Sequence, residues 1–231
     1  MEDYTSEQFN EFKAIGYPRS LSNRDLRGKN FEGFDLEGVN FEKSNLEGVN
    51  FSNTDLTNTN FSGANLRGAN LKGANFSNAN LTGAKFTKIG IRATDLTNSI
   101  FIGANLTDAD LSEALLHGAN FQGANLTGAI LLKSRIHGAN FRETNLTNAN
   151  LTGANGTSLG MRNSISVFFH NSNLTGANLY KVILKNADLT GANLTGANFT
   201  NADVENVDFS DSITTNCKFD NANLKNSIGI N

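Results

Sequence analysis

Residues 61–81 decide the fold, because they read FSGANLRGANLKGANFSNANL and place Leu or Phe at every fifth position. Each large apolar residue follows an Asn, which itself follows a small residue, as in Ala64, Asn65 and Leu66. The spacing extends in both directions from this stretch. From Leu21 to Leu151, every fifth position is Leu, Phe or Ile without exception.

A period of five matches neither an α-helix, with 3.6 residues per turn, nor a long strand, with a period of two. It is satisfied if each unit is a short extended segment followed by a bend. The small residue and the Leu or Phe two positions later then point to the same side, while Gly, Asn and Asp suit the bend. One unit cannot bury its own apolar residue, so the units are expected to wind into coils that stack.

The pattern A(D/N)Lxx resembles that of the pentapeptide-repeat family over more than four-fifths of the chain. The resemblance implies an all-β fold, a right-handed quadrilateral β-helix with four pentapeptides in each coil. Positions i and i+20 are then expected to share a column. One such column contains Phe41, Phe61, Phe101, Phe121 and Phe141, interrupted by Leu81, and the next contains Leu26, Leu46, Leu66, Leu106, Leu126 and Leu146, interrupted by Phe86.

The repeat divides the chain into segments of a single domain. Residues 1–20 precede the repeat, 21–155 form a first run, 156–173 are irregular, and 174–231 form a second run and a tail. In residues 5–16, a capping box and an apolar face that includes Phe9 and Phe12 predict a short α-helix that caps the N-terminal end of the solenoid. The C-terminal end shows no equivalent cap, which suggests a homodimer formed through that end.

Composition indicates whether the protein binds nucleic acid or a membrane, and in which compartment it is expected. The 22 acidic and 19 basic residues give a net charge of −3, without the basic stripe typical of nucleic-acid binding. No stretch approaches the roughly 18 apolar residues of a membrane span. The single Cys217 and an acidic N-terminal segment without an apolar core predict a cytoplasmic protein that binds neither nucleic acid nor membrane.

Two histidines are candidate metal ligands. His117 and His137 occupy positions i and i+20 and are expected to stack on neighbouring coils, within the reach of a metal ion. Their column continues with Thr97 and Thr157, so it contains no third ligand. No metal site and no cofactor are therefore predicted. Ser and Thr residues show no adjacent His and acid constellation, so no catalytic residues are predicted and an enzyme is not expected.

Apolar residues at positions that are usually polar mark candidate contacts with a partner. They are Ile100, Ile102, Leu115, Ile130 and Leu132 in the first run, and Leu159, Met161, Ile165 and Phe168 in the irregular segment. Two interpretations remain open: the irregular segment covers the first group, or both groups contact a partner.

The sequence thus predicts a non-catalytic rigid scaffold or protein-interaction module whose protein partner is unknown. The resemblance implies an alternative, because some pentapeptide-repeat proteins mimic DNA and bind type II topoisomerases through strongly acidic faces. This chain departs from that pattern, since lysines and arginines are interspersed among its acidic residues. The second alternative is a metal-binding protein that uses the stacked histidines.

Overall fold

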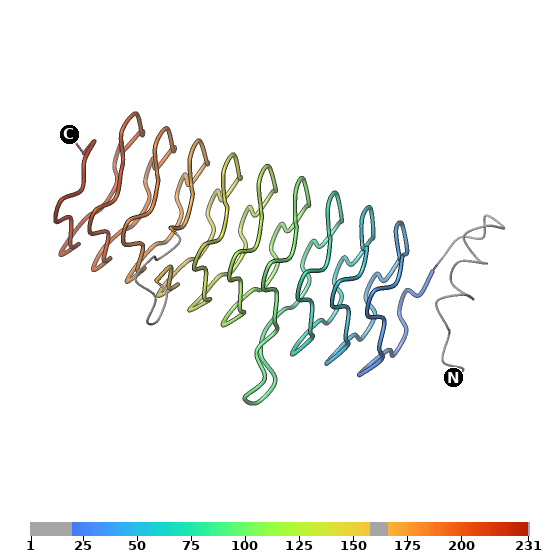
Figure 1. Cartoon of the computed structure of the whole chain (residues 1–231). Helices are drawn as coiled ribbons and strands as arrows, with labels where there is room; N and C mark the ends of the chain where they lie inside the picture. Colours follow the sequence, from blue (N-terminus) through green and yellow to red (C-terminus); the bar gives the residue numbers. More distant parts are fainter. Residues whose placement is uncertain (1–19, 158–165, 231) are drawn as a thin grey trace.

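The computed structural model describes residues 20–157 and 166–230. These residues wind into a rod of stacked coils, with residue 20 near one end and the last coil at the other (Figure 1). Within the described ranges no residue is helical, and the β-structure consists of isolated bridges rather than longer strands. The capping helix expected over residues 5–16 lies outside the described residues.

Parallel bridges connect each coil to the next. They join the residue before each central Leu or Phe to its counterpart one coil later, as in Asn105 with Asn125 and Asn125 with Asn145. Since such partners are separated in sequence by four pentapeptides, the fold is a β-helix with four pentapeptides in each coil. The expected β-helix and its four pentapeptides in each coil are confirmed.

Residues 125–129 show how one unit is built. Leu126 and Ala129 are fully buried, and the N–H of Ala129 donates to the carbonyl oxygen of Leu126 at 3.0 Å, which closes the bend. Gly128 has a φ of +67°, a conformation that glycine adopts without steric cost. The Asn125 side chain accepts the N–H of Thr127 at 3.1 Å. The repeat therefore selects a small residue, an Asx residue, a large apolar residue and a turn former for separate structural reasons.

Phenylalanines stack along one of the four core columns. Ring centroids are 5.0 Å apart between Phe76 and Phe101, 4.7 Å between Phe101 and Phe121, and 4.9 Å between Phe121 and Phe141. Phe169 continues this column at 5.0 Å from Phe141. Stacked rings add to the hydrophobic stabilisation that their burial provides.

The two columns expected from a strict spacing of i and i+20 are wrong beyond Phe86. Phe41 stacks on Phe61 at 4.8 Å as expected, but Asn80 pairs with Asn105, five pentapeptides later instead of four. The column of Phe61 and Leu81 therefore continues with Leu106 instead of reaching Phe101. The cause is a pentapeptide between Phe86 and Leu96 that leaves the coil.

The second departure from the period lies between residues 157 and 166. Asn140 pairs with Phe168, which lies 28 residues later instead of the regular 20. This coil is therefore longer than four pentapeptides by more than one pentapeptide. Val167 and Phe169 are both buried in the core as a regular unit. The repeat therefore resumes at residue 167, one pentapeptide earlier than expected, because Val167 is small enough for the inward site before Phe169.

The last described coil, residues 214–230, is less buried than the others. Phe219, Leu224 and Ile230 are only partly buried, although they pack against the core. The side chains of Ile213 and Ile228 are 52% and 57% exposed. In the described ranges, no helix has the length and apolar character needed to cross a bilayer.

Candidate functional site

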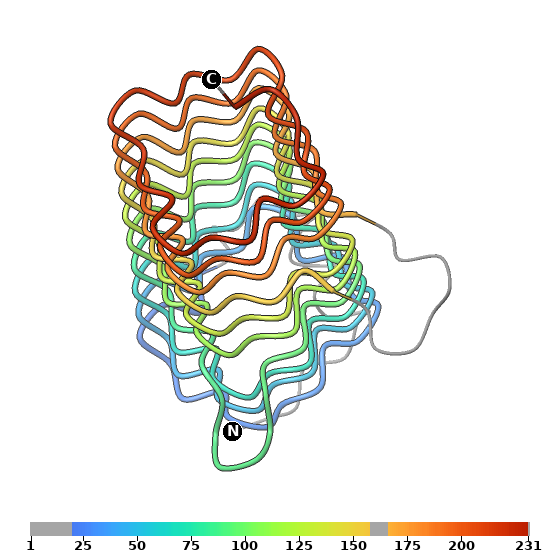
Figure 2. The ribbon, with the colours of Figure 1, turned by 90° about the vertical axis from the view of Figure 1, so that its left-hand side faces the viewer.

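A β-hairpin, residues 87–93, projects from the rod (Figures 1 and 2). Ile89 and Arg92 exchange both backbone hydrogen bonds, at 2.8 and 2.9 Å, and form an antiparallel bridge. Gly90 and Ile91 make the two-residue loop between them. Gly90 has a φ of +54°, and a type II′ turn requires glycine at this first loop position.

Ile91 fits the five-residue spacing but is the most exposed large apolar residue described, at 105% of its reference area. The residues around it explain why the unit leaves the coil. Ile89 would occupy the inward site that holds Ala in most units, and Gly90 cannot provide the side chain that caps the turn. An isoleucine at the small site would overpack the core. The hairpin therefore replaces a unit that the coil could not accommodate.

The hairpin leans over a row of glycines on the preceding coils. The Ile89 Cδ1 atom lies 3.2 Å from where a Cβ on Gly68 would stand, and an Arg92 guanidinium nitrogen lies 3.5 Å from the corresponding point at Gly48. Where the chain rejoins the coil, the Thr94 hydroxyl oxygen accepts the N–H of Gly68 at 2.8 Å. These contacts fix the direction in which the hairpin projects.

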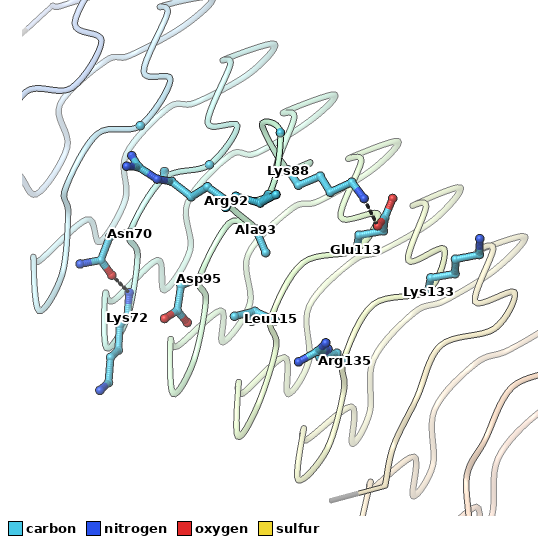
Figure 3. A pocket seen from close by; sticks show the side chains of 15 residues that line it. Asn70, Lys72, Lys88, Arg92, Ala93, Asp95, Glu113, Leu115, Lys133 and Arg135 are labelled. Atoms are coloured by element: carbon cyan, nitrogen blue, oxygen red, sulfur yellow. Dashed lines mark hydrogen bonds and ion pairs between the residues drawn. The ribbon is translucent and has the colours of Figure 1, made fainter. Parts of the chain in front are cut away.

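A groove of about 890 Å³, which we call the hairpin groove, lies beside the hairpin and includes Gly48 and Gly68 in its lining. Residues 90–93 form one wall, and the floor is a row of outward residues on successive coils. Figure 3 shows Asp95, Leu115 and Arg135 following one another along this row. Side chains at the rim are Lys72, Lys88, Glu113 and Lys133.

Positive charge is concentrated around the hairpin groove. Its lining includes five cationic residues, Lys72, Lys88, Arg92, Lys133 and Arg135, and two acidic residues, Asp95 and Glu113. Lys88 and Glu113 form an ion pair at 2.5 Å. One Asp95 carboxylate oxygen accepts the N–H of Thr97 at 2.9 Å and so caps a turn. The groove is therefore a cationic surface on a chain whose net charge is −3.

The two candidate histidines lie on neighbouring coils, as predicted. The ring centroids of His117 and His137 are 6.2 Å apart. Burial lowers the pKa of His117, and the nearby charges of His137 and Arg135 lower that pKa further. The Nδ1 atoms of both rings are buried and have no hydrogen-bond partner among the described residues. Within those residues no group of three or more His, Cys, Asp or Glu side chains could hold a metal ion.

The apolar candidates are spread over three faces of the rod. Ile100 and Ile102 flank Phe101, Ile130 and Leu132 flank Leu131, and Leu115 precedes Leu116, so each group belongs to a different core column. Among these five residues, only Leu115 lines the hairpin groove.

The candidates in the irregular segment are divided between described and undescribed residues. Phe168 points outward from a regular unit, with the Arg142 guanidinium 4.0 Å from the centre of its ring. Leu159, Met161 and Ile165 lie outside the described residues, so their role remains a prediction.

The five-residue spacing alone does not reveal the groove, because Ile91 matches the repeat. The available signal was local. Among the repeat units between residues 36 and 155, the unit of Ile91 alone combines an isoleucine at the small inward site (Ile89) with a glycine at the site directly before the central residue (Gly90).

Comparison with known families identifies the repeat. The family model described as pentapeptide repeats matches the chain in eight copies, over residues 20–53, 50–88, 92–128, 119–155, 134–163 and 172–211. The chain belongs to the pentapeptide-repeat family. The matched ranges leave out residues 89–91 at the tip of the hairpin, which agrees with their exclusion from the coil.

Two solved structures show the same fold as this pentapeptide-repeat protein. One is HetL, a pentapeptide repeat protein involved in heterocyst differentiation regulation in the cyanobacterium Nostoc sp. strain PCC 7120. It is 25% identical, with a TM-score of 0.58, and the match covers 96% of this chain and 95% of HetL.

The other structure is QnrB1, a plasmid-mediated fluoroquinolone resistance protein. It is 22% identical, with a TM-score of 0.53 and coverage of 88% of this chain and 82% of QnrB1, and this likeness shows the fold alone. No curated protein sequence matches the chain significantly.

Proposed function

We propose that this pentapeptide-repeat protein is a non-catalytic interaction module that binds a protein partner at the hairpin groove. The observation that carries the proposal is the hairpin itself, which presents Ile91 fully to solvent beside a groove of about 890 Å³. An apolar side chain held at the edge of a concave surface is suited to act as an anchor for a protein partner. A rigid rod that holds such a loop in a fixed position is a suitable scaffold for recognition.

The groove suits binding better than catalysis. Its lining contains Lys, Arg, Asp and Glu but no histidine, cysteine or serine, so a hydroxyl or thiol nucleophile paired with a histidine base is missing from the described lining. The single Cys217 fits a reducing compartment, and we therefore propose that the protein acts in the cytoplasm.

Mimicry of DNA has less support. A DNA mimic needs a strongly acidic surface, whereas the hairpin groove is lined by an excess of cations. We therefore propose no topoisomerase partner for this chain.

The decisive experiment removes the hairpin without disturbing the coil. Replacement of residues 88–93 by a single glycine leaves Thr87, Gly and Thr94 between Phe86 and Asp95, which restores the five-residue spacing. A partner is first isolated from the native cell with the wild-type protein, and its affinity is then measured with both purified proteins. We expect the hairpin replacement to abolish binding, with an unchanged circular dichroism spectrum.

A matched control tests exposed apolar residues elsewhere on the rod. Ile102→Ser changes an exposed isoleucine on another face and should leave the affinity unchanged. Full binding by the hairpin replacement would refute the proposed function. Loss of binding only in the Ile102 variant would move the contact to that other face.

We also propose a homodimer formed through the last coil. The proposal is supported by its partly exposed core residues and by Ile213 and Ile228, which a second copy could cover. Light scattering at micromolar concentration should give twice the monomer mass, and Ile228→Lys should reduce it to the monomer mass. A monomeric wild-type protein would refute the dimer.

A further inference from the structure

We propose that the hairpin groove binds an extended acidic segment of a partner protein that carries one apolar side chain. This inference rests on the proposed function and adds the chemistry of the partner. It follows from three properties of the groove: its charge, its length and its apolar floor.

The charge of the groove is complementary to an acidic ligand. Lys72, Arg92, Lys133 and Arg135 have no carboxylate within ion-pair distance among the described residues, although Lys88 pairs with Glu113 in the groove and other ion pairs form elsewhere on the rod. Opposite charges across an interface accelerate association and select the partner. A ligand with several carboxylates would form ion pairs with these four cations, for which the described residues provide no carboxylate.

The acidic residues of the groove do not cancel this field. Glu113 is paired with Lys88, and Asp95 accepts a turn N–H from Thr97. In Figure 3, Lys88 and Glu113 face each other at one side, while Arg92 lies above Asp95 and Arg135 lies beyond Leu115 in the row of Asp95. The two arginines can therefore contact carboxylates at two separated points of one ligand.

The length of the groove suits a short extended segment. Its lining runs from Gly48 to Arg135, which are separated by four coil steps. At about 4.8 Å per step this is about 19 Å, the length of about six extended residues. The backbone of the floor is already bonded to neighbouring coils, as in Leu116 N–H to Arg135 carbonyl at 2.8 Å. Recognition would therefore use side chains rather than addition of a β-strand.

The apolar contribution comes from Leu115 in the floor and Ile91 at the tip of the hairpin. Leu115 lies between Asp95 and Arg135 in the same row, so an apolar ligand side chain placed there would have charged neighbours on both sides. This mixed lining favours a peptide over a nucleic acid, which binds to a denser series of cations along its phosphates.

The experiment measures binding of defined peptides to the full chain. The probe is a fluorescein-labelled peptide of about six residues, in which glutamates flank one central leucine, sized from the groove length. The control peptide has glutamine at every glutamate. Fluorescence anisotropy should show binding of the acidic peptide only, and the affinity should fall as added salt shortens the Debye length from about 30 to about 8 Å.

Charge reversal then locates the site. The double variant Arg92→Glu and Arg135→Glu should weaken binding of the acidic peptide by at least about tenfold, and it should bind a lysine version of the peptide better than the wild type does. Lys218→Glu, four coil steps beyond the coil of Arg135 and on another face of the rod, is the control and should leave the affinity unchanged. Circular dichroism verifies that each variant retains the β-helix.

The outcomes separate this inference from the proposed function. Equal binding of the acidic and glutamine peptides would overturn the inference, as would tighter binding of a single-stranded thymidine oligonucleotide that depends on Arg92 and Arg135. If a cellular partner needs the hairpin but is indifferent to charge reversal and salt, the acidic ligand is wrong and the proposed function stands. If the partner binds without the hairpin, the proposed function itself fails.

Discussion

Ile91→Ala and Leu96→Ala should differ sharply in stability, although the two residues occupy equivalent positions of the repeat. Leu96 is fully buried in a core column, whereas Ile91 is 105% exposed at the tip of the hairpin. Removal of a buried leucine side chain costs about 2–5 kcal/mol, because apolar contacts are lost and a cavity remains. Substitution of an exposed residue stays within about 0.5 kcal/mol.

Thermal and urea unfolding provide the measurement. For a chain of this size, 1 kcal/mol shifts Tm by about 2–4 °C, so Leu96→Ala should lower Tm by about 4–20 °C. Ile91→Ala should leave Tm within about 2 °C of the wild type on the same scale. Since long repeat arrays can lose cooperativity, each variant must show a single transition by two probes before midpoints are compared. Comparable losses in both variants would show that the pentapeptide containing Ile91 belongs to the coil.

Three further predictions concern the turns and the last coil. Gly73→Ala should destabilise more than Gly83→Ala, because both have positive φ (67° and 62°) but only Gly73 has the Asn53 side-chain oxygen 2.6 Å from the added Cβ; urea unfolding measures the difference, and equal losses would count against the contact. Glu143→Gly should stabilise the fold by about 0.5–1 kcal/mol, since Glu143 has a φ of +57° and a side chain is strained there; a lower urea midpoint would contradict this. Burial raises the pKa of Cys217 to about 11, so its thiolate forms only as the pH approaches that value. Alkylation by iodoacetamide at pH 8 should therefore be about a hundredfold slower than for a free thiol. An alkylation rate that levels off near pH 9 would show an ordinary pKa.

The fold was predictable because one physical requirement repeats in every unit. A large apolar residue at every fifth position, with a small residue two positions before it, can be buried only in a stacked coil. The five-residue spacing alone did not predict the hairpin, since Ile91 satisfies this spacing as well as Leu96 does. The coil excludes it because of its neighbours Ile89 and Gly90, which do not suit the small inward site and the capping site.

The candidate site was less predictable than the fold. Leu115 was predicted as a contact residue and lies in the groove, but Arg92 and Arg135 were not expected to act together. Arg92 and Arg135 are far apart in sequence, and Arg92 lies outside the coil because its pentapeptide is displaced into the hairpin. That displaced pentapeptide also decides which residues are neighbours beyond Phe86, so the surface could not be assembled from a strict spacing of i and i+20.

Cysteine cross-linking across the hairpin tests the account most directly. In a Cys217→Ser background, Asn80→Cys is combined either with Asn105→Cys or with Ile100→Cys. Asn80 pairs with Asn105 on the neighbouring coil, whereas Ile100 pairs with Asn75 and Asn120 on another face. Neighbouring coils about 4.8 Å apart allow a disulfide between paired positions. Mild oxidation followed by mass spectrometry should therefore show a disulfide between positions 80 and 105 and none between 80 and 100. A disulfide between 80 and 100 would mean that the pentapeptide containing Ile91 lies inside the coil and that the hairpin groove does not exist.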